Sequence, residues 1–196
     1  PFRGVESHSL RQNIIIIMFQ GSIPALITPF KNGNIDYESF YKIIEWSLSE
    51  GSHGFVPCGT TGESPTLSHQ EHIKVVDECV RIVDKRVPVI AGTGSNNTVE
   101  AIEFTNQAEK SGADAALVVT PYYNKPTQEG LQAHFKKIAE STSLPIIIYN
   151  IPGRSMVDMT IDTMSVLSNI SNIVGVKDAT NDLFRPLLTQ TKIQKD

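Results

Sequence analysis

Lys177 is the residue of this sequence with the clearest capacity for covalent chemistry. It closes the apolar run Ile173-Val-Gly-Val, which is typical of a buried strand. Burial at such a position disfavours the charged form and lowers the pKa of the lysine from about 10.4. A neutral amine can then attack a carbonyl and form an imine. Taken alone, a lysine here is more often a solvated residue at the start of a loop. The residues at the neighbouring strand ends therefore decide between a solvated lysine and a catalytic one.

Tyr149 and Arg154 follow the preceding apolar run, in Tyr149-Asn-Ile-Pro-Gly-Arg154. A phenol near hydroxyl groups can relay the protons that imine formation requires. An arginine after a Pro-Gly turn can bind a carboxylate through two parallel hydrogen bonds. The alternatives are a tyrosine that caps the core and an ordinary surface arginine.

Thr60 and Thr61 lie in a glycine-flanked loop between Gly59 and Gly62. Their backbone N–H groups could bind a carboxylate, and one hydroxyl could join the proton relay. The two glycines suit a loop that approaches a ligand closely. A plain turn is the alternative.

Cofactor and metal sites are not favoured by the remaining motifs. Gly92-Thr-Gly94 lacks the third glycine of a dinucleotide loop, and no phosphate-binding P-loop is present. His69 and His72 are spaced for one helix face, but no third metal ligand is evident, so a surface or interface role is favoured. Two cysteines provide neither a disulfide framework nor a metal cluster and indicate a reducing cytosol.

Apolar runs and helical patterns alternate about every 30 residues, the size of a βα repeat. Asp36, Ser68 with Glu71, and Asn97 provide helix-start signals, and Gly51 and Gly112 provide stop signals. The runs are continuous rather than alternating, which predicts a parallel sheet covered on both faces. The predicted strands are residues 23–28, 54–58, 87–91, 115–120, 145–149 and 173–177.

An α/β fold of the TIM (β/α)8 barrel type is favoured over an open doubly wound sheet, because no glycine-rich phosphate loop follows the first strand. About six βα units are present, so the barrel is predicted to be incomplete. Residues 1–17 precede the first methionine and are interpreted as a leader or a remnant of expression, and residues 18–196 as the N-terminal part of the barrel.

The composition excludes two further classes of protein. A formal net charge of −4 provides no basic field for nucleic acid. No apolar run reaches the ~18 residues of a membrane span. A globular enzyme of the cytoplasm is therefore expected.

Four motifs in order resemble the dihydrodipicolinate synthase family. They are Gly59-Thr-Thr-Gly-Glu-Ser64, Tyr122-Tyr-Asn-Lys-Pro126, Tyr149-Asn-Ile-Pro-Gly-Arg154 and Gly175-Val-Lys177-Asp-Ala179. The resemblance runs from about Met18 to the end of the chain. It implies a homotetrameric (β/α)8 lyase of lysine and diaminopimelate biosynthesis, which condenses pyruvate with aspartate 4-semialdehyde to 4-hydroxy-tetrahydrodipicolinate without a cofactor.

The resemblance also implies a role for each matching residue. Lys177 forms the Schiff base with pyruvate, and Tyr149, Thr60 and Tyr123 relay protons, with Tyr123 supplied by a neighbouring subunit. Thr61 holds the pyruvate carboxylate, and Arg154 receives the semialdehyde. Lysine-sensitive members bind the inhibitor at positions that match Ser64, His69, His72, Asn96, Glu100 and Tyr122.

Two alternatives stay open at this point. One is a sister pyruvate aldolase of the N-acetylneuraminate lyase type, although the Thr-Thr pair and Arg154 favour the synthase. The other is a non-catalytic fragment of the synthase, because the family's last two βα units have no counterpart here. Six strands leave two edges unpaired, and we expect lower stability and activity than in a closed barrel.

Overall fold

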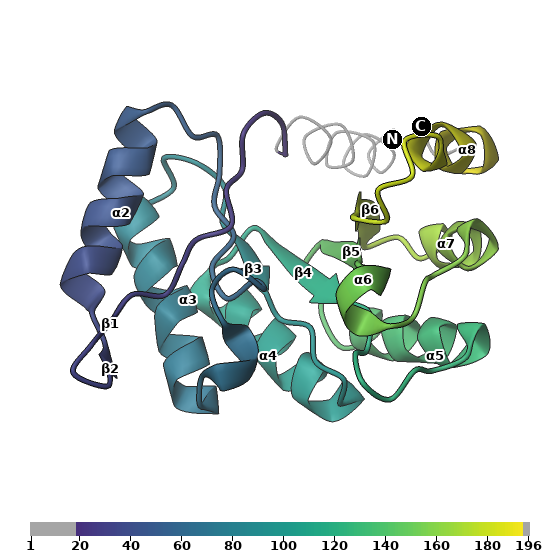
Figure 1. Cartoon of the computed structure of the whole chain (residues 1–196), viewed down its shortest axis with the longest axis horizontal. Coiled ribbons are helices and arrows are strands. Elements are labelled where there is room, and N and C mark those ends of the chain that lie inside the picture. Colours follow the sequence, from purple (N-terminus) through teal and green to yellow (C-terminus); the bar gives the residue numbers. More distant parts are fainter. Residues whose placement is uncertain (1–18, 194–196) are drawn as a thin grey trace, which may run out of the picture.

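Four parallel strands form the centre of the computed structural model, which describes residues 19–193 (Figure 1). They are paired in chain order as β3 (Ile90–Gly92), β4 (Ala115–Val119), β5 (Ile146–Asn150) and β6 (Ile173–Asp178). Parallel bridges extend this order to two earlier segments, through Ala25 with Val56 and Phe55 with Val89. Six parallel segments in sequential order are the arrangement of a (β/α)8 barrel, of which about six units are present, as predicted. Residues 1–17, interpreted above as a leader, lie outside the described residues.

The prediction that the first two segments form regular strands is wrong. Residues 23–28 and 54–58 each form isolated bridges only. Each segment contains a proline, Pro24 or Pro57, and proline has no N–H to donate to a sheet ladder. Hydrogen bonds still hold both segments in place, such as the one from Leu26 N to Val56 O at 2.9 Å. The order of the segments in the barrel is therefore retained, although the first two form isolated bridges instead of a continuous hydrogen-bond ladder.

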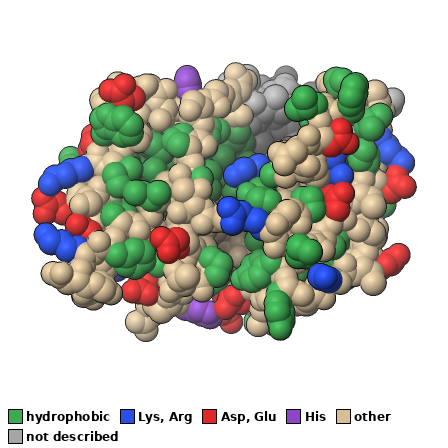
Figure 2. All heavy atoms as spheres, in the orientation of Figure 1, with side chains coloured by type: hydrophobic (Ala, Val, Ile, Leu, Met, Phe, Trp, Pro, Cys, Tyr) green, Lys and Arg blue, Asp and Glu red, His purple; other side chains and the backbone are tan. Residues whose placement is uncertain are grey.

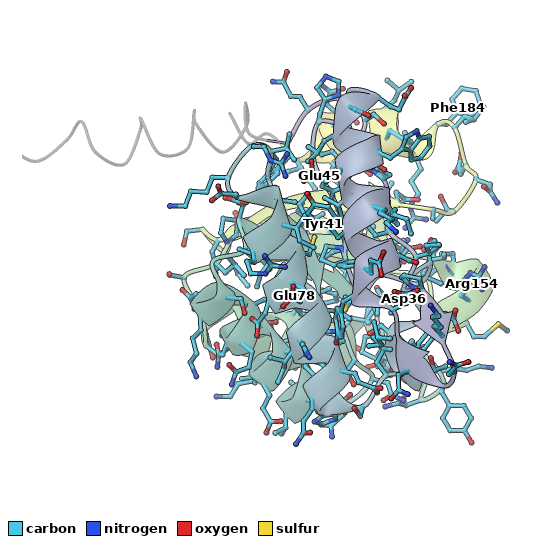
Figure 3. All side chains as sticks on the ribbon, turned by 90° about the vertical axis from the view of Figure 1, so that its left-hand side faces the viewer. Asp36, Tyr41, Glu45, Glu78, Arg154 and Phe184 are labelled. Carbon is cyan, nitrogen blue, oxygen red and sulfur yellow. The ribbon has the colours of Figure 1, made fainter. Side chains whose placement is uncertain are left out.

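Helices α2, α3, α4, α5, α7 and α8 follow one another around the outside of the strands, and each of these contacts the next (Figure 1). Figure 3 shows α2 and α3 side by side, with Tyr41, Glu45 and Glu78 along their seam. An ion pair between Glu45 and Arg86, with Oε1 2.5 Å from Nη2, ties α2 to the turn after α3. The helices are α2 (Tyr37–Ser49), α3 (His69–Val83), α4 (Thr98–Ser111), α5 (Gln128–Ala139), α6 (Pro152–Ser155), α7 (Ile161–Ser168) and α8 (Arg185–Lys192).

The predicted helix starts are confirmed by their capping hydrogen bonds. The Asp36 side chain accepts from Ser39 N before α2, and the Asn97 side chain accepts from Val99 N before α4. Ser68 and Glu71 form a reciprocal capping box before α3. Each such cap contributes about 1 kcal/mol to helix stability. These local signals therefore place each helix start relative to the strand before it.

The alternation of side chains along the strands produces two apolar clusters. Phe55, Val118 and Ile148 point outward and pack with the helices in the larger cluster. Leu117 and Tyr149 belong to a smaller cluster on the interior face of the strands. Successive strand residues point to opposite faces, so this assignment fixes which strand-end residues face the interior. Tyr149 is one of them.

A short hairpin precedes α2. β1 (Phe30–Lys31) pairs with β2 (Asn34–Ile35), and the loop residues Asn32 and Gly33 both have positive φ, at 53° and 78°. This is the conformation that an Asn-Gly turn favours. The hairpin occupies the position after the first segment where a glycine-rich phosphate loop would lie in an open doubly wound sheet.

The outer edge of β6 has no strand partner among the described residues. Gly175, Val176 and Lys177 on this strand are exposed. Two apolar residues near α8, Leu183 and Phe184, are 88% and 73% exposed, and Figure 3 shows Phe184 projecting from the body of the molecule. The predicted unpaired edge is therefore present at β6.

Candidate active site

Tyr149 and Lys177 lie opposite each other on adjacent strands. The register of β5 and β6 shifts between Ile146 and Ile147, where β6 contains an extra residue, and beyond the shift Tyr149 is paired with Lys177. Paired residues of neighbouring parallel strands point to the same face of a sheet. The prediction that these two side chains occupy equivalent strand ends is therefore confirmed.

The amine of Lys177 is placed over the ring of Tyr149, with Nζ 4.3 Å from the ring centroid. Partial burial lowers the pKa of Lys177 from its ordinary value. The residue nevertheless remains exposed, so a ligand can reach its amine. A lowered pKa increases the fraction of neutral amine at neutral pH, and that is the form that attacks a carbonyl.

A cavity of about 230 Å³ opens beside Tyr149 at the C-terminal ends of the strands, and Lys177 is not among the residues of its wall. Thr60, Tyr149 and Arg154 supply polar groups to its wall, and Leu117 and Val119 supply apolar surface. Figure 2 shows this face, which is hollowed near its middle with Lys and Arg side chains at the rim. A small apolar cavity with a few polar groups is typical of a binding site for a small molecule.

Two glycines in the cavity wall permit close backbone packing. A Cβ on Gly92 would lie 2.2 Å from the carbonyl oxygen of Cys58, and one on Gly94 would lie 2.3 Å from Val119 N. Neither position has room for a side chain. Gly92-Thr-Gly94 therefore packs closely against neighbouring strand ends. This packing explains why both glycines are present although the motif lacks the third glycine of a dinucleotide loop.

The loop after the second segment is arranged differently from the prediction. Thr60 lines the cavity, whereas Thr61 is exposed and does not line it. A Cβ on Gly62 would lie 3.0 Å from the carbonyl oxygen of Leu26, so Gly62 is needed for packing on backbone rather than for approach to a ligand. Gly59 has ordinary contacts only. Gly59 nevertheless lines the cavity, whereas the expected approach of Gly62 to a ligand is wrong.

Tyr122 and Tyr123 diverge although they are consecutive. Tyr122 lines the cavity, whereas Tyr123 is 89% exposed and has a φ of 72°. This left-handed backbone is uncommon for a residue with a bulky side chain. Within this chain, Tyr123 is apart from the other predicted relay residues, Tyr149 and Thr60.

Some of the residues predicted to bind the inhibitor form a charged cluster, and others line the cavity. Glu100 pairs with His69, with Oε1 2.6 Å from Nε2, and it accepts a hydrogen bond from Ser95 Oγ. The hydrogen bond from Ser95, followed by that from His69, lowers the pKa of Glu100, so its carboxylate is anionic. Ser64 and Tyr122 line the cavity, and the backbone oxygen of Asn96 accepts from Asn124 Nδ2.

The burial of His72 corrects the predicted surface or interface role of the pair His69 and His72. It is 2% exposed and its ring stacks on Phe104 at a centroid distance of 4.0 Å, whereas the side chain of His69 is 56% exposed. Burial lowers the pKa of His72 to about 4. The reason lies in helix geometry, because His72 is on the face of α3 that also buries Val75, Val76 and Cys79.

The model of the dihydrodipicolinate synthetase family matches residues 18–196 of this chain. The chain belongs to this family. The match covers the strands, the cavity and every predicted site residue. The resemblance inferred from four motifs is therefore confirmed over the barrel as a whole.

Relatives within the dihydrodipicolinate synthetase family are close in sequence and structure. The chain is 63% identical over 179 residues to the 4-hydroxy-tetrahydrodipicolinate synthase of Rhodospirillum centenum, covering 91% of this chain and 62% of that protein. The crystal structure of the Acinetobacter baumannii dihydrodipicolinate synthase complexed with pyruvate is 53% identical with a TM-score of 0.87, over 89% of this chain and 60% of that one. The Cyanidioschyzon merolae enzyme with lysine bound is 38% identical with a TM-score of 0.84, over 89% and 60% of the two chains. The chain thus spans about three fifths of the length of these relatives.

Some residues around this family site were not singled out from the sequence. Asp158 and Arg185 form an ion pair with Arg185 Nη1 2.8 Å from Asp158 Oδ2, and Arg185 Nε lies 2.9 Å from Asp178 Oδ2. The available signal was Asp178, which directly follows Lys177. Its partner comes from another element, so spacing alone could not identify Arg185.

Residues 19–193 contain neither a cluster of metal-ligating side chains nor a membrane-spanning helix. In that range no three His, Cys, Asp or Glu residues are grouped so that they could hold a metal ion. Over the same residues, no helix has both the length and the apolar character needed to cross a bilayer.

Proposed function

We propose that this chain carries the imine-forming site of a 4-hydroxy-tetrahydrodipicolinate synthase, which condenses pyruvate with aspartate 4-semialdehyde. The observation that carries the proposal is the placement of Lys177 Nζ over the ring of Tyr149, a residue of the cavity wall. The lowered pKa of Lys177 supports a nucleophilic amine. The names of the relatives and the pyruvate complex of the Acinetobacter baumannii enzyme support the same reaction.

The chemistry follows from an amine and a keto acid. The neutral amine of Lys177 attacks the carbonyl carbon of pyruvate, and the resulting carbinolamine loses its oxygen as water to leave an imine. Tyr149, Thr60 and Tyr123 carry protons to and from that oxygen. The imine then loses a methyl proton, and the resulting enamine attacks the aldehyde of the second substrate.

The two carboxylates of the substrates need separate partners. Arg154 lines the cavity from α6 and is exposed, so its guanidinium is accessible to the semialdehyde carboxylate. Thr61 provides a hydroxyl and a backbone N–H beside Thr60 for the pyruvate carboxylate. Because Thr61 does not line the cavity in this chain, its loop must turn for this role.

A homo-oligomer supplies the last relay group. Tyr123 is almost fully exposed in this chain, and such an aromatic side chain is suited to insertion into a neighbouring subunit. We place the active assembly, a homotetramer, in the cytosol, because both cysteines are unpaired buried thiols. No cofactor is required by the imine route.

The test is a direct assay of substrate choice. Purified protein is incubated with pyruvate and aspartate 4-semialdehyde, and product is measured by mass spectrometry; a parallel reaction replaces the semialdehyde by N-acetylmannosamine. Product from the semialdehyde alone supports the synthase. Product from the sugar alone assigns the site to a sister aldolase, and a pyruvate adduct without either product limits this chain to imine formation.

Replacement of Tyr149 by phenylalanine is expected to slow imine formation by about 10²–10⁴-fold, because a proton-transfer group is lost. The ring that contacts Lys177 is retained, so the fold and the lysine pKa should change little. Rapid quenching with borohydride after mixing with pyruvate measures the rate. Tyr41→Phe on the exposed face of α2 is the matched control. Equal rates for Tyr149→Phe and the unmodified protein would exclude the relay.

A second binding site, for lysine, is proposed at Ser64, His69, His72, Asn96, Glu100 and Tyr122. The anionic Glu100 offers a partner for an ammonium group, and the lysine bound to the Cyanidioschyzon merolae enzyme supports the same ligand here. Tyr122 lies in the cavity wall next to Tyr123, so a ligand that moves Tyr122 also moves a relay residue. The His69 contact must open or be shared, since it already occupies one Glu100 oxygen.

Glu100→Gln is expected to weaken lysine binding about tenfold or more, because a charge-assisted contact with the ammonium group is lost. Isothermal titration calorimetry with free lysine measures the affinity. Glu103→Gln, on the exposed side of the same helix, should bind lysine like the unmodified protein. Equal affinities for both variants would move the site elsewhere.

A further inference from the structure

A partly buried charge network lies behind the two strand ends that carry Tyr149 and Lys177. Its centre is Arg185, at the start of α8, whose side chain is only 11% exposed. The guanidinium lies between Asp158 and Asp178, and its Nη2 also donates to the backbone oxygen of Met159. The Arg185–Asp178 contact is a close ion pair rather than an aligned hydrogen bond. A planar guanidinium with several partners is a rigid connector.

Each carboxylate in this network is tied to one of the two strand ends. Asp178 directly follows Lys177 in β6, and its Oδ1 also accepts from Thr180 N at 3.0 Å. Asp158 Oδ1 accepts from Asn150 Nδ2 at 2.8 Å, and Asn150 directly follows Tyr149 in β5. Asn150 and Asp178 are also paired in the strand register. One guanidinium thus joins the residues next to both members of the proposed imine site.

The network acts from the face opposite the cavity. Successive strand residues point to opposite faces, so Asn150 and Asp178 point away from the side that presents Tyr149 and Lys177. None of Asp158, Asp178 and Arg185 is part of the cavity wall. Arg185 pairs with Asp178 on that opposite face, so any effect on chemistry must pass through the strand ends.

β6 depends on this connection more than the other central strands do. Its outer edge has no strand partner among the described residues, and its register with β5 contains the shift that brings Lys177 opposite Tyr149. Near its C-terminal end, the ion pair to Arg185 attaches the strand to α8. A second ion pair, between Lys192 and Asp162, attaches the far end of α8 to α7.

We propose that Arg185 is a positioning residue for imine formation: by joining Asp178 to Asp158 and Asn150, it holds β5 and β6 in the register that places Lys177 against Tyr149. The inference rests on the proposed function for its chemical consequence, but the geometry that it claims can be measured without pyruvate. It assigns Arg185 neither substrate contact nor proton transfer.

The experiment uses the full chain with Arg185→Lys, which keeps the charge and loses the planar fork. The first measurement is the rate of pyruvate trapping at Lys177 by borohydride, expected to fall about 10-fold to 100-fold because small displacements of reacting groups are costly. The second is the pH dependence of Lys177 acetylation, followed by peptide mass spectrometry. Its midpoint should rise toward that of an ordinary lysine, because a loosened strand end exposes the amine to water.

Arg81→Lys is the matched control, since Arg81 forms a surface ion pair with Glu78 within α3. Both measurements should match the unmodified protein there. An Arg185→Lys protein with unchanged circular dichroism, trapping rate and acetylation midpoint overturns the proposal. If Arg185→Lys does not fold, Asp158→Asn removes one arm of the network and is judged by the same criteria.

The outcomes separate this inference from the proposed function. Absence of a pyruvate adduct in the unmodified protein refutes the imine chemistry. The acetylation midpoint then still decides the role of Arg185, because it reports the environment of Lys177 alone. A midpoint that rises in the variant supports the positioning role, and one that stays in place overturns it.

Discussion

Lys177→Ala is expected to abolish the adduct that forms when pyruvate and borohydride are added to the protein. The amine that attacks the keto carbon is absent in this variant, and no neighbouring strand end in the described part of the chain supplies another lysine. Loss of a covalent nucleophile typically costs about 10⁴-fold or more in turnover. Intact mass measures the adduct, and peptide mass spectrometry locates it. In the unmodified protein, the added mass should be confined to the peptide that contains Lys177.

A control lysine makes this result specific. Lys110 is exposed at the end of α4, and Lys110→Ala should form the adduct at the normal rate. Lys177→Ala removes an exposed side chain from an edge strand, so the fold should persist in circular dichroism. A folded Lys177→Ala protein that still gains a borohydride-stable pyruvate mass would assign the imine to another amine.

The pairing of Tyr149 with Lys177 could be predicted in part from the sequence. Both close apolar runs, and equivalent ends of neighbouring parallel strands meet at one edge of a sheet. The register shift that aligns them could not be predicted, because the extra residue of β6 has no distinguishing side chain. The spacing therefore predicted that Tyr149 and Lys177 lie near each other, whereas the extra residue of β6 determines that they are paired.

The order of the barrel was predictable, but the regularity of its first strands was not. Apolar runs identify buried segments without showing how many N–H groups are available, and Pro24 and Pro57 remove donors. The hairpin at Asn32-Gly33 was signalled by its turn dipeptide, yet the short strands beside it lack clear alternation. Helix starts were predicted well because caps are local hydrogen bonds.

Residues whose role depends on distant partners were the hardest to predict. Arg185 acts through Asp158, which lies 27 positions earlier in the chain. Thr61 lies beside Thr60 in sequence but does not line the cavity, so adjacency did not imply a shared cavity wall. The surface interpretation of His72 was wrong because it considered only metal-ligand spacing rather than the buried stripe of α3.

The burial of His72 and His134 leads to the second large prediction, a loss of stability in mild acid. Each ring is almost fully buried, and Nε2 of each has no hydrogen-bond partner among the described residues. Nδ1 of His134 lies 2.9 Å from Thr98 Oγ1 and links α5 to α4. Burial lowers the pKa of both from 6.5 to about 4. The folded protein therefore keeps both rings neutral where the unfolded chain would protonate them.

The sign of the effect follows from proton binding. Between pH 6.5 and about 4 the unfolded state binds more protons, so stability is complete above pH 6.5 and falls as the pH decreases through this window. At pH 5 the expected loss is roughly 2 kcal/mol for each histidine, given about 1.4 kcal/mol per pKa unit. Carboxylates such as Glu100 and Glu109, whose pKa values are lowered, titrate below their ordinary 4.5 and contribute only at lower pH. Most of the change above pH 5 is therefore assigned to the two rings.

Urea unfolding at pH 7 and pH 5, followed by circular dichroism, measures the loss directly. His134→Gln retains a polar group near Thr98 and should reduce the pH-dependent loss by roughly 2 kcal/mol, even if its stability at pH 7 is lower. His53→Gln, at an exposed position, should retain the full loss. A loss that is identical in His134→Gln and His53→Gln would mean that His134 is protonated equally in the folded and unfolded states.

Because His72 stacks on Phe104 beside the His69–Glu100 pair, its protonation should also disturb the proposed lysine site before the whole chain unfolds. Lysine affinity should then decrease toward pH 5 at temperatures where circular dichroism still reports a folded protein.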